Sequence, residues 1–284
     1  MRIHEMDLAE LAKLIGTATD LGINIFDHAD IYGGGRSEEV FADAMGMTSS
    51  ARDAIIIQSK CGIRESYYDF SKSHILTSVE NSLRRLRTDY LDILLLHRPD
   101  SLMEPEEVAD AFDSLQQAGK VRQFGVSNQN PMQIELLKSH VRQDLIVNQL
   151  QLSIAATGIV DSGLSVDANI PHSGADGHAL EYCRIKGITI QAWSPLQLAG
   201  WAGTFLGADK FPELNATLER MAQASGVSAA TVAIAWILRH PANMQAIVGT
   251  TSAARIAQIV KAADITLSRE EWYELYRSAG NELP

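Results

Sequence analysis

Short apolar runs alternate with longer amphipathic segments along the whole chain, and this alternation constrains the fold more than any other feature. The runs are almost continuously apolar, which is typical of parallel strands buried on both faces. The segments between them carry apolar residues at helical spacing, as Leu8, Leu11 and Ile15 do. The pattern predicts an α/β protein with a parallel sheet covered by helices. Strands are expected at 23–27, 54–60, 91–97, 121–127, 145–153, 188–194 and 246–250.

The number of apolar runs indicates a barrel that is one strand short. A closed (β/α)8 TIM barrel has eight strands, whereas the chain has seven apolar runs, and only Met1 to Ile3 are left for a first strand. An open barrel would leave two apolar edges unpaired. We therefore predict a single barrel domain over 1–284 whose strand one is short or truncated, with Met1–Ile3 paired between 23–27 and 246–250. The alternative is that residues upstream of Met1 complete this strand in the native protein.

Two long segments interrupt the otherwise short connections. Residues 153–177 are rich in Gly, Ser and Asp, and 195–212 form a second such segment. Both follow predicted strands, and long loops on a tight scaffold commonly bind ligands or act as lids. We expect both on the catalytic face of the barrel.

The composition disfavours several classes of function. The net charge of −11 over 284 residues argues against general nucleic-acid binding, which needs a clustered basic surface. No apolar run approaches the ~20 residues of a membrane span, and the N-terminus lacks a signal-peptide pattern. Cys61 and Cys183 are too few for a disulfide framework or a structural zinc site. We expect a cytoplasmic protein, monomeric or weakly homo-oligomeric, whose partner is a small molecule rather than nucleic acid or a membrane.

Three of the predicted strands end at a side chain that can hold or steer a proton. The run 23–27 ends at Asp27, with Tyr32 five residues further on, and the next two runs end at Lys60 and His97. Burying an unpaired charge costs several kcal/mol, so such residues are poor core positions. The carboxyl ends of barrel strands meet on the face that carries the active site. We therefore expect these side chains to converge there.

Together these residue types suit proton transfer at a carbonyl oxygen. Tyr32 would donate the proton, and Lys60 would lower the pKa of Tyr32. Asp27 would hold Lys60 in place, and His97 would donate a hydrogen bond to the carbonyl oxygen. Each residue alone also has a structural explanation: a cap for Asp27, an amine reaching solvent for Lys60, a bond to a loop carbonyl for His97. Their joint position at successive strand ends favours a site.

The same motifs resemble those of the aldo-keto reductases over nearly the whole chain. FDHADIYG supplies an Asp and, five residues on, a Tyr; SKCG supplies a Lys and LLLHRPD a His. In that family an Asp–Tyr–Lys–His tetrad on an (α/β)8 barrel reduces aldehydes or ketones with NADPH, without metal or flavin. The resemblance therefore implies NADP(H) as the cofactor. It implies that the catalytic residues are Asp27, Tyr32, Lys60 and His97.

The resemblance also implies which residues hold the cofactor. GKVRQFGVSN and VNQLQLS would supply partners of the nicotinamide carboxamide. AWSPL would supply an aromatic ring for the nicotinamide and contacts to the pyrophosphate, and IVGTTSAARIAQI would bind the adenosine end, with Arg255 on the 2′-phosphate. The implied cofactor contacts are Ser127, Asn128, Gln149, Trp193, Ser194, Pro195, Leu196, Gly249, Thr250, Thr251, Ser252, Arg255 and Gln258.

Some positions depart from the family pattern. Gly249 stands where many members carry a Lys against the cofactor phosphate, which leaves Arg255 as the clear cation that would favour NADPH over NADH. His28 stands where small residues are commoner, and it would either narrow the pocket or pair with Asp30.

Two other functions fit the same residues. One is a non-catalytic or weakly active NADPH-sensing accessory protein on the same fold, against which the complete tetrad argues. The other is a metal-dependent barrel enzyme. It would use Asp27, His28, Asp30 and His97, but Lys60 beside a cation would be repelled.

Overall fold

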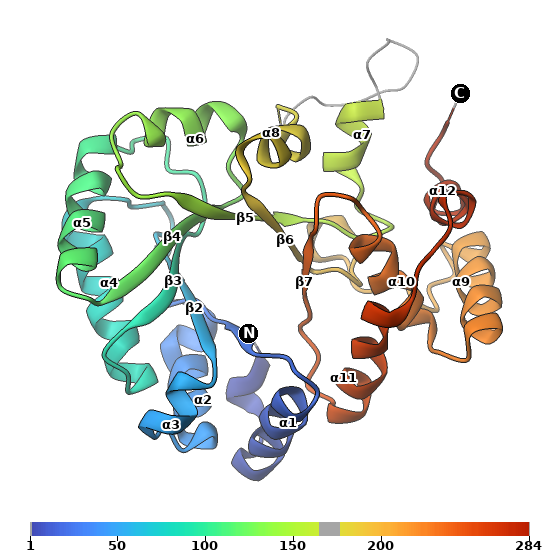
Figure 1. Ribbon diagram of the computed structural model, residues 1–284, viewed down its shortest axis with the longest axis horizontal. Coiled ribbons are helices and arrows are strands. Elements are labelled where there is room, and N and C mark those ends of the chain that lie inside the picture. Colours follow the sequence, from blue (N-terminus) through green and yellow to red (C-terminus); the bar gives the residue numbers. More distant parts are fainter. Residues whose placement is uncertain (1, 165–176, 284) are drawn as a thin grey trace. The chain divides into compact units, whose positions relative to one another are not determined.

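The structure is a computed structural model that describes residues 2–164 and 177–283 of the chain (Figure 1). The chain divides into two compact units. Unit 1 contains Met1–Asn148 with Thr251–Ala253, and unit 2 contains Gln149–Thr250 with Ala254–Pro284. The single domain over 1–284 stays a prediction.

All seven predicted strands are confirmed within the described residues, and they follow one another in chain order in one sheet. Pairing is parallel between β1 and β2, β2 and β3, β3 and β4, and β6 and β7. Burial follows the apolar runs, since every residue of β3 except Asp92 is buried. The strands are β1 (Ile25–Asp27), β2 (Ile56–Cys61), β3 (Leu91–Leu96), β4 (Val121–Ser127), β5 (Leu145–Gln151), β6 (Thr189–Trp193) and β7 (Gln245–Ile247).

Several helices of unit 1 begin at a capping side chain. Asp7 accepts hydrogen bonds from the backbone N–H of Ala9 and Glu10 at the start of α1 (Leu8–Asp20). Asn130 and Gln133 form a capping box at α6 (Pro131–Lys138). Such caps satisfy backbone groups that a first helical turn leaves unpaired. The other helical elements before β5 are η1 (Arg2–Glu5), η2 (Tyr32–Gly35), α2 (Arg36–Met45), α3 (Ser49–Asp53), α4 (Lys72–Leu86) and α5 (Pro105–Gln117).

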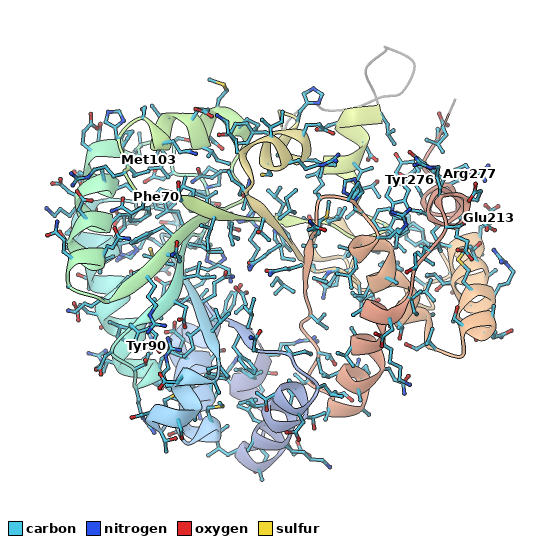
Figure 2. The ribbon with its side chains drawn as sticks, in the orientation of Figure 1. Phe70, Tyr90, Met103, Glu213, Tyr276 and Arg277 are labelled. Atoms are coloured by element: carbon cyan, nitrogen blue, oxygen red, sulfur yellow. The ribbon has the colours of Figure 1, made fainter. Side chains whose placement is uncertain are left out.

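The core of unit 2 is built around α10 (Ala229–Leu238), which is buried throughout 231–237. Trp236 of α10 and Trp272 of α12 (Arg269–Ser278) stack with ring centroids 4.7 Å apart. Tyr276 lies one turn further along α12 and stacks on Trp272 with centroids 5.9 Å apart (Figure 2). The other helical elements after β5 are α7 (Gly158–Leu164), α8 (Ala179–Lys186), η3 (Ala199–Trp201), α9 (Pro212–Ser225), α11 (Ala253–Ile259) and η4 (Val260–Asp264).

None of the helices in the described ranges is by itself long and apolar enough to cross a membrane. α9 and α10 reach the required length and composition only as a pair, and they are bent by 93° at the break between them.

The N-terminal segment does not form the predicted strand. Arg2–Glu5 is a 3-10 helix, and within the described residues it pairs with no strand, while Met1 lies outside them. The imidazole of His4 packs against the turn at η2: a Cβ on Gly33 would lie 2.7 Å from it, and Ser37 Oγ lies 3.5 Å from Nδ1. Asp7 starts α1 directly afterwards. These contacts favour a helical turn and leave no extended stretch for a strand.

The two long segments contain short elements that the sequence did not predict. Ser153 and Ala156 form an isolated bridge, and Gly158–Leu164 folds as α7. In the second segment Gln197 pairs with Thr204. The part of the first segment at 165–176 lies outside the described residues.

Candidate active site

Asp27 and Lys60 meet where β1 and β2 end. The strand register pairs Asp27 with Gln58, and Lys60 lies two residues further along β2 on the same face. Lys60 Nζ lies 2.6 Å from Asp27 Oδ2, and Gln58 Nε2 donates to Asp27 Oδ1 at 2.5 Å. Both carboxylate oxygens are therefore held, which fixes the orientation of the carboxylate. Gln58 is a residue of the site that the strand-end argument missed.

The Lys60 ammonium is fully buried and is directed by its acceptors. Besides Asp27, it donates to the backbone oxygen of His28 at 2.8 Å and to Tyr32 Oη at 3.2 Å. An ammonium group has three donors and no acceptor, so each of its hydrogens has a partner. Burial alone lowers the pKa of Lys60, but Asp27 and Tyr32 together raise it above its ordinary value. The amine is therefore charged at neutral pH.

Tyr32 is carried by a tight glycine-rich turn between β1 and α2. Gly33 has a φ of 59°, a left-handed conformation that residues with a Cβ rarely adopt. Gly35 lies so close to Arg85 that a Cβ there would be 2.9 Å from its guanidinium. These glycines let the turn bring the Tyr32 ring to the buried amine, with 5.0 Å between the ring centroid and Lys60 Nζ.

His97 follows β3 and faces the same phenol. Its backbone N–H donates to Cys61 O at 2.9 Å, which extends the pairing of β2 and β3 past the end of the strand. The imidazole is edge-on to the Tyr32 ring, with centroids 5.9 Å apart. Burial, and then the Lys60 charge, lower the pKa of His97 to about 3, so the imidazole is neutral at pH 7. A neutral imidazole donates from one nitrogen, as a hydrogen bond to a carbonyl oxygen requires.

The pKa of Tyr32 moves against the prediction. Burial raises it above its ordinary value, the Lys60 ammonium lowers it by less, and Asp27 adds to the rise. The expected net lowering by Lys60 is therefore wrong, because the charge of Lys60 is balanced by Asp27 and the phenol is buried. The phenol keeps its proton at neutral pH.

A second group of buried polar side chains lies beside the turn that carries Tyr32. Glu38 is fully buried, accepts from Ser59 Oγ at 2.6 Å and accepts from Arg85 Nε at 2.7 Å. Burial and the Glu38 carboxylate raise the pKa of Asp30 to about 6. Asp30 Oδ1 has no hydrogen-bond partner in the described part of the chain. The burial of Glu38 was not predicted from the sequence.

His28 packs into the core instead of pairing with Asp30. Its ring lies against Phe41 with centroids 4.5 Å apart, and burial lowers its pKa to about 3. His28 Nε2 and Asp30 Oδ1 both lack a hydrogen-bond partner among the residues described, so the two side chains do not pair through these atoms. Over the described ranges, no three His, Cys, Asp or Glu side chains are grouped so that they could hold a metal ion.

The predicted nicotinamide contacts of unit 1 lie at the end of β4. Ser127 is buried, and Asn128 Nδ2 donates to Ser127 Oγ at 2.8 Å and to His97 O at 3.2 Å. Asn128 has a φ of 59°, which Asn tolerates better than most residues. The residues that the structure brings together are thus the four tetrad members with Ser127 and Asn128. Thr251 and Ser252 also belong to unit 1 and precede α11.

The other predicted cofactor contacts belong to unit 2. Gln149 Nε2 donates to Gln191 Oε1 at 3.0 Å, so side-chain amides pair between β5 and β6. Trp193 ends β6, and Ser194 follows with a φ of 53° and donates to Gln197 Oε1 at 3.1 Å. Pro195 and Leu196 continue that turn, Gly249 and Thr250 follow β7, and Arg255 and Gln258 are exposed on α11.

Comparison with known proteins identifies the family to which the chain is similar. The model of the Aldo/keto reductase family matches residues 1–278. The chain is 39% identical over 288 residues to "Uncharacterized oxidoreductase YcsN" of Bacillus subtilis (strain 168), covering 97% of this chain and 90% of that protein. It is 38% identical over 273 residues to "6-dehydroglucose reductase" of Agrobacterium fabrum, covering 92% and 85%. A crystal structure of an aldo/keto reductase from Klebsiella pneumoniae with NADP and acetate has a TM-score of 0.77 at 28% identity, covering 98% and 87%.

The chain belongs to the aldo/keto reductase family and is an oxidoreductase with the α/β barrel fold of that family. The predicted family and fold class are confirmed.

Proposed function

We propose that the protein reduces an aldehyde or ketone to an alcohol with NADPH, and that Tyr32 is the general acid. The observation that carries this proposal is the hydrogen bond that Lys60 Nζ donates to Tyr32 Oη at 3.2 Å. A phenol both donates and accepts. Because its oxygen accepts from Lys60, its hydrogen remains available to a substrate.

Each tetrad member has one role in the proposed reaction. NADPH supplies the hydride that the carbonyl carbon receives. Tyr32 Oη gives its proton to the carbonyl oxygen, which becomes the hydroxyl of the alcohol. Lys60, held by Asp27, stabilises the phenolate that remains, and water then returns a proton to it. His97 donates a hydrogen bond to the carbonyl oxygen while negative charge develops there.

The residues expected around NADP(H) suit such a molecule chemically. Ser127 and Asn128 offer a hydroxyl and an amide beside His97 for the carboxamide. Arg255 is exposed on α11 and supplies the cation that a 2′-phosphate needs. A Cβ on Gly249 would meet no atom within 4 Å, so the backbone there is open to approach. We infer that NADP(H) is held by Ser127, Asn128, Gln149, Trp193, Ser194, Pro195, Leu196, Gly249, Thr250, Thr251, Ser252, Arg255 and Gln258.

We infer that sugar carbonyls are the first substrate class to examine. The support is a relative at 38% identity that is named 6-dehydroglucose reductase. A panel of dehydro sugars, aldoses and simple aromatic aldehydes at fixed NADPH would rank the classes by kcat/KM. A flat ranking across the panel would contradict a preference for sugars.

Replacing Tyr32 by Phe tests the assignment of the acid. The variant keeps the ring and loses the transferable proton, so kcat should fall by about 10²–10⁴-fold, while NADPH affinity in a fluorescence titration stays unchanged. Tyr90→Phe is the matched control, since Tyr90 lies in unit 1 between Arg52 and Arg122 (Figure 2). Near-normal turnover of Tyr32→Phe would exclude Tyr32 as the acid.

The NADPH titration and the turnover measurements together distinguish a reductase from an NADPH-sensing accessory protein. A reductase should turn over at least one carbonyl of the panel at a rate that Tyr32→Phe abolishes. Tight NADPH binding with no turnover of any panel member would favour the sensing role instead.

We also infer that the protein works in the cytoplasm as a monomer or a weak homo-oligomer. Its two cysteines, Cys61 and Cys183, are buried thiols, as suits a reducing compartment. Light scattering over a range of concentrations would measure the mass, and a stable, concentration-independent oligomer would contradict this inference.

A further inference from the structure

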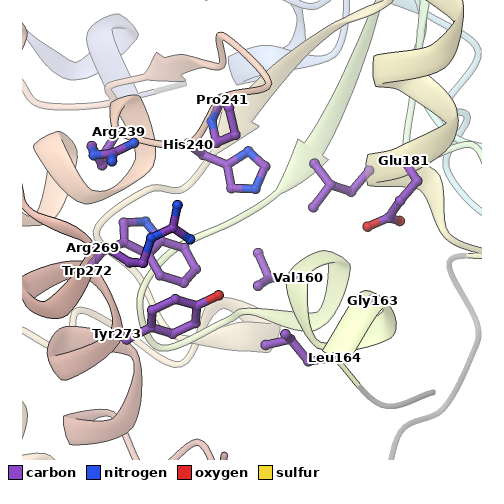
Figure 3. A pocket seen from close by; sticks show the side chains of 11 residues that line it. Val160, Gly163, Leu164, Glu181, Arg239, His240, Pro241, Arg269, Trp272 and Tyr273 are labelled. Atoms are coloured by element: carbon purple, nitrogen blue, oxygen red, sulfur yellow. The ribbon is translucent and has the colours of Figure 1, made fainter.

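Unit 2 contains a pocket that neither the tetrad nor the proposed cofactor contacts use. It has a volume of about 370 Å³ and is lined by α7, α8, residues 239–241 after α10, and the start of α12 (Figure 3). Ligand pockets in proteins commonly measure about 300–1,000 Å³. The pocket therefore has room for a small organic molecule.

One side of the pocket is apolar and rigid. Val160 and Leu164 of α7 line it, together with Trp272 of α12. Trp272 Nε1 donates to Trp236 O at 3.0 Å, and Trp236 Nε1 donates to Trp272 O at 3.0 Å, so both indoles are fixed. Because these side chains are already ordered, a ligand ring that packs on them would bind without the entropic cost of ordering them.

Two guanidinium groups and a phenol supply donors to the same pocket. Arg239 lines the pocket, and a hydrogen bond from its Nε to Leu267 O at 2.7 Å fixes the side chain. Its terminal nitrogens carry further N–H donors. Arg269 is the first residue of α12 and Tyr273 lies one turn further along it. The Tyr273 hydroxyl points toward the middle of the pocket (Figure 3). Guanidinium groups match the two oxygens of a carboxylate in geometry and charge.

His240 adds a neutral donor. Its Nδ1 accepts from the backbone N–H of Ala242 at 3.2 Å. Burial, with the charges of Arg184 and Arg239, lowers the pKa of His240 to about 4, so the ring is uncharged at pH 7. A neutral imidazole that accepts at Nδ1 carries its hydrogen on Nε2.

Glu181 of α8 faces the pocket from the other side (Figure 3). Its Oε2 is buried and has no hydrogen-bond partner among the described residues. α7 packs closely on it at Gly163, where a Cβ would lie 2.7 Å from Glu181 Oε1. A buried acceptor without a donor costs about 1–3 kcal/mol. A hydroxyl on a bound molecule would supply a donor to this oxygen.

We propose that this pocket is a second small-molecule site, and that it binds an aromatic carboxylate whose hydroxyl lies at the end of the molecule away from the carboxylate, as in a hydroxyphenylalkanoate. The carboxylate meets Arg239, Arg269 and His240, the hydroxyl donates to Glu181, and the ring packs on Trp272. The lining carries two guanidinium charges and one carboxylate charge, which suits a monoanion better than a phosphate dianion. The site belongs to unit 2 and does not depend on the proposed reductase activity.

Calorimetric titration with 3-(4-hydroxyphenyl)propanoate tests the proposal. The two comparison probes are 3-phenylpropanoate, which lacks the hydroxyl, and 3-(4-hydroxyphenyl)propanamide, which lacks the charge. Wild-type protein should bind 3-(4-hydroxyphenyl)propanoate more tightly than either. Arg269→Gln should weaken this probe at least tenfold, because a partner of the carboxylate is lost, and the fold should stay intact because Arg269 is exposed. Arg277→Gln is the matched control, since Arg277 is exposed on the same helix outside the pocket (Figure 2).

Two further variants separate this site from others. Glu181→Met removes the acceptor at similar size, so 3-(4-hydroxyphenyl)propanoate should lose its advantage over 3-phenylpropanoate. If that variant is unstable, Tyr273→Phe replaces it, and this substitution should weaken both acids. Tyr32→Phe should bind 3-(4-hydroxyphenyl)propanoate as wild type does. The proposal is wrong if wild type shows no saturable binding at millimolar probe, if Arg269→Gln and Arg277→Gln have equal effects, or if Tyr32→Phe abolishes binding.

Discussion

At the scale of single residues, Asp30, which precedes the turn that carries Tyr32, lowers the stability of the folded protein at neutral pH. Burial and the neighbouring Glu38 raise its pKa from 3.8 to about 6. In the unfolded chain the group ionises near pH 4, whereas in the folded protein it keeps its proton until about pH 6. The free energy of unfolding therefore falls as the pH rises from about 4 to 6, by about 3 kcal/mol in total, and stays lower above that range.

Asp30→Asn removes this penalty while keeping the shape of the side chain. We expect the free energy of unfolding, measured with urea, to rise by about 1–3 kcal/mol at pH 7 and to change little at pH 4, where folded Asp30 is already neutral. Asp20→Asn is the control, because Asp20 is exposed. An unchanged loss of stability between pH 4 and 6 in Asp30→Asn would assign that loss to another group.

Gly249 is a second residue whose surroundings allow a direct test. A Cβ there would meet no atom within 4 Å, so a side chain fits. Gly249→Lys should restore the cation that many family members carry. NADPH should bind about ten- to a hundredfold more tightly, since a charge-assisted contact contributes about 1.5–3 kcal/mol, while NADH affinity stays the same. Gly249→Met has the length without the charge. If Met tightens NADPH as much as Lys, the effect comes from packing rather than from charge.

At the scale of elements, α2 and α4 are joined by one buried ion pair. Glu38 of α2 accepts from Arg85 of α4 and from Ser59 of β2, and no part of Glu38 is exposed. Removing one partner of a buried pair leaves the other charge uncompensated, which costs about 3–5 kcal/mol. Glu38→Gln should therefore lower the free energy of unfolding by about that amount in chemical denaturation.

The neighbouring Glu39 gives a control for this ion pair. Glu39 is exposed on the same helix, so Glu39→Gln should change the free energy of unfolding by no more than about 0.5 kcal/mol. Equal effects of the two substitutions would mean that Glu38 affects the free energy of unfolding only through its charge on the helix. The buried contact with Arg85 would then not be stabilising.

The strand elements were predictable because their signal is local. A continuous apolar run predicts a buried parallel strand. Asp27, Lys60 and His97 were found because a charged or titratable group at the end of such a run has no role in the core. Gln58 carried a usable signal as well. It lies two residues before Lys60 in the same run, and the period of two places both on one face.

The helical elements that were missed depend on contacts between distant residues. Gly158 and Gly163 disfavour a helix, and α7 forms because Ile159 and Val160 are buried. The segment at Arg2–Glu5 is helical because His4 reaches Gly33 and Ser37. Likewise, a glutamate in a helix is normally solvated, and the partners that bury Glu38 come from β2 and α4.

At the scale of the whole molecule, β5 links the stability of the two compact units. Its residues up to Asn148 belong to unit 1, and those from Gln149 belong to unit 2. If either unit unfolded alone, part of this buried strand would lose the partners of its backbone groups, which is costly. We therefore expect the chain to unfold as one domain over 1–284.

Scanning calorimetry with and without NADPH tests this expectation. One transition, with equal calorimetric and van't Hoff enthalpies, should appear. NADPH at a hundredfold excess over its Kd should stabilise the native state by about 2.7 kcal/mol and raise the Tm of that single transition by about 5 °C. Tyr32→Phe should show the same rise, because the variant loses proton transfer and not cofactor binding. Two separate transitions, or a rise confined to one of them, would show that the units unfold independently. A single transition that NADPH leaves unmoved would instead contradict the proposed cofactor and leave the single domain standing.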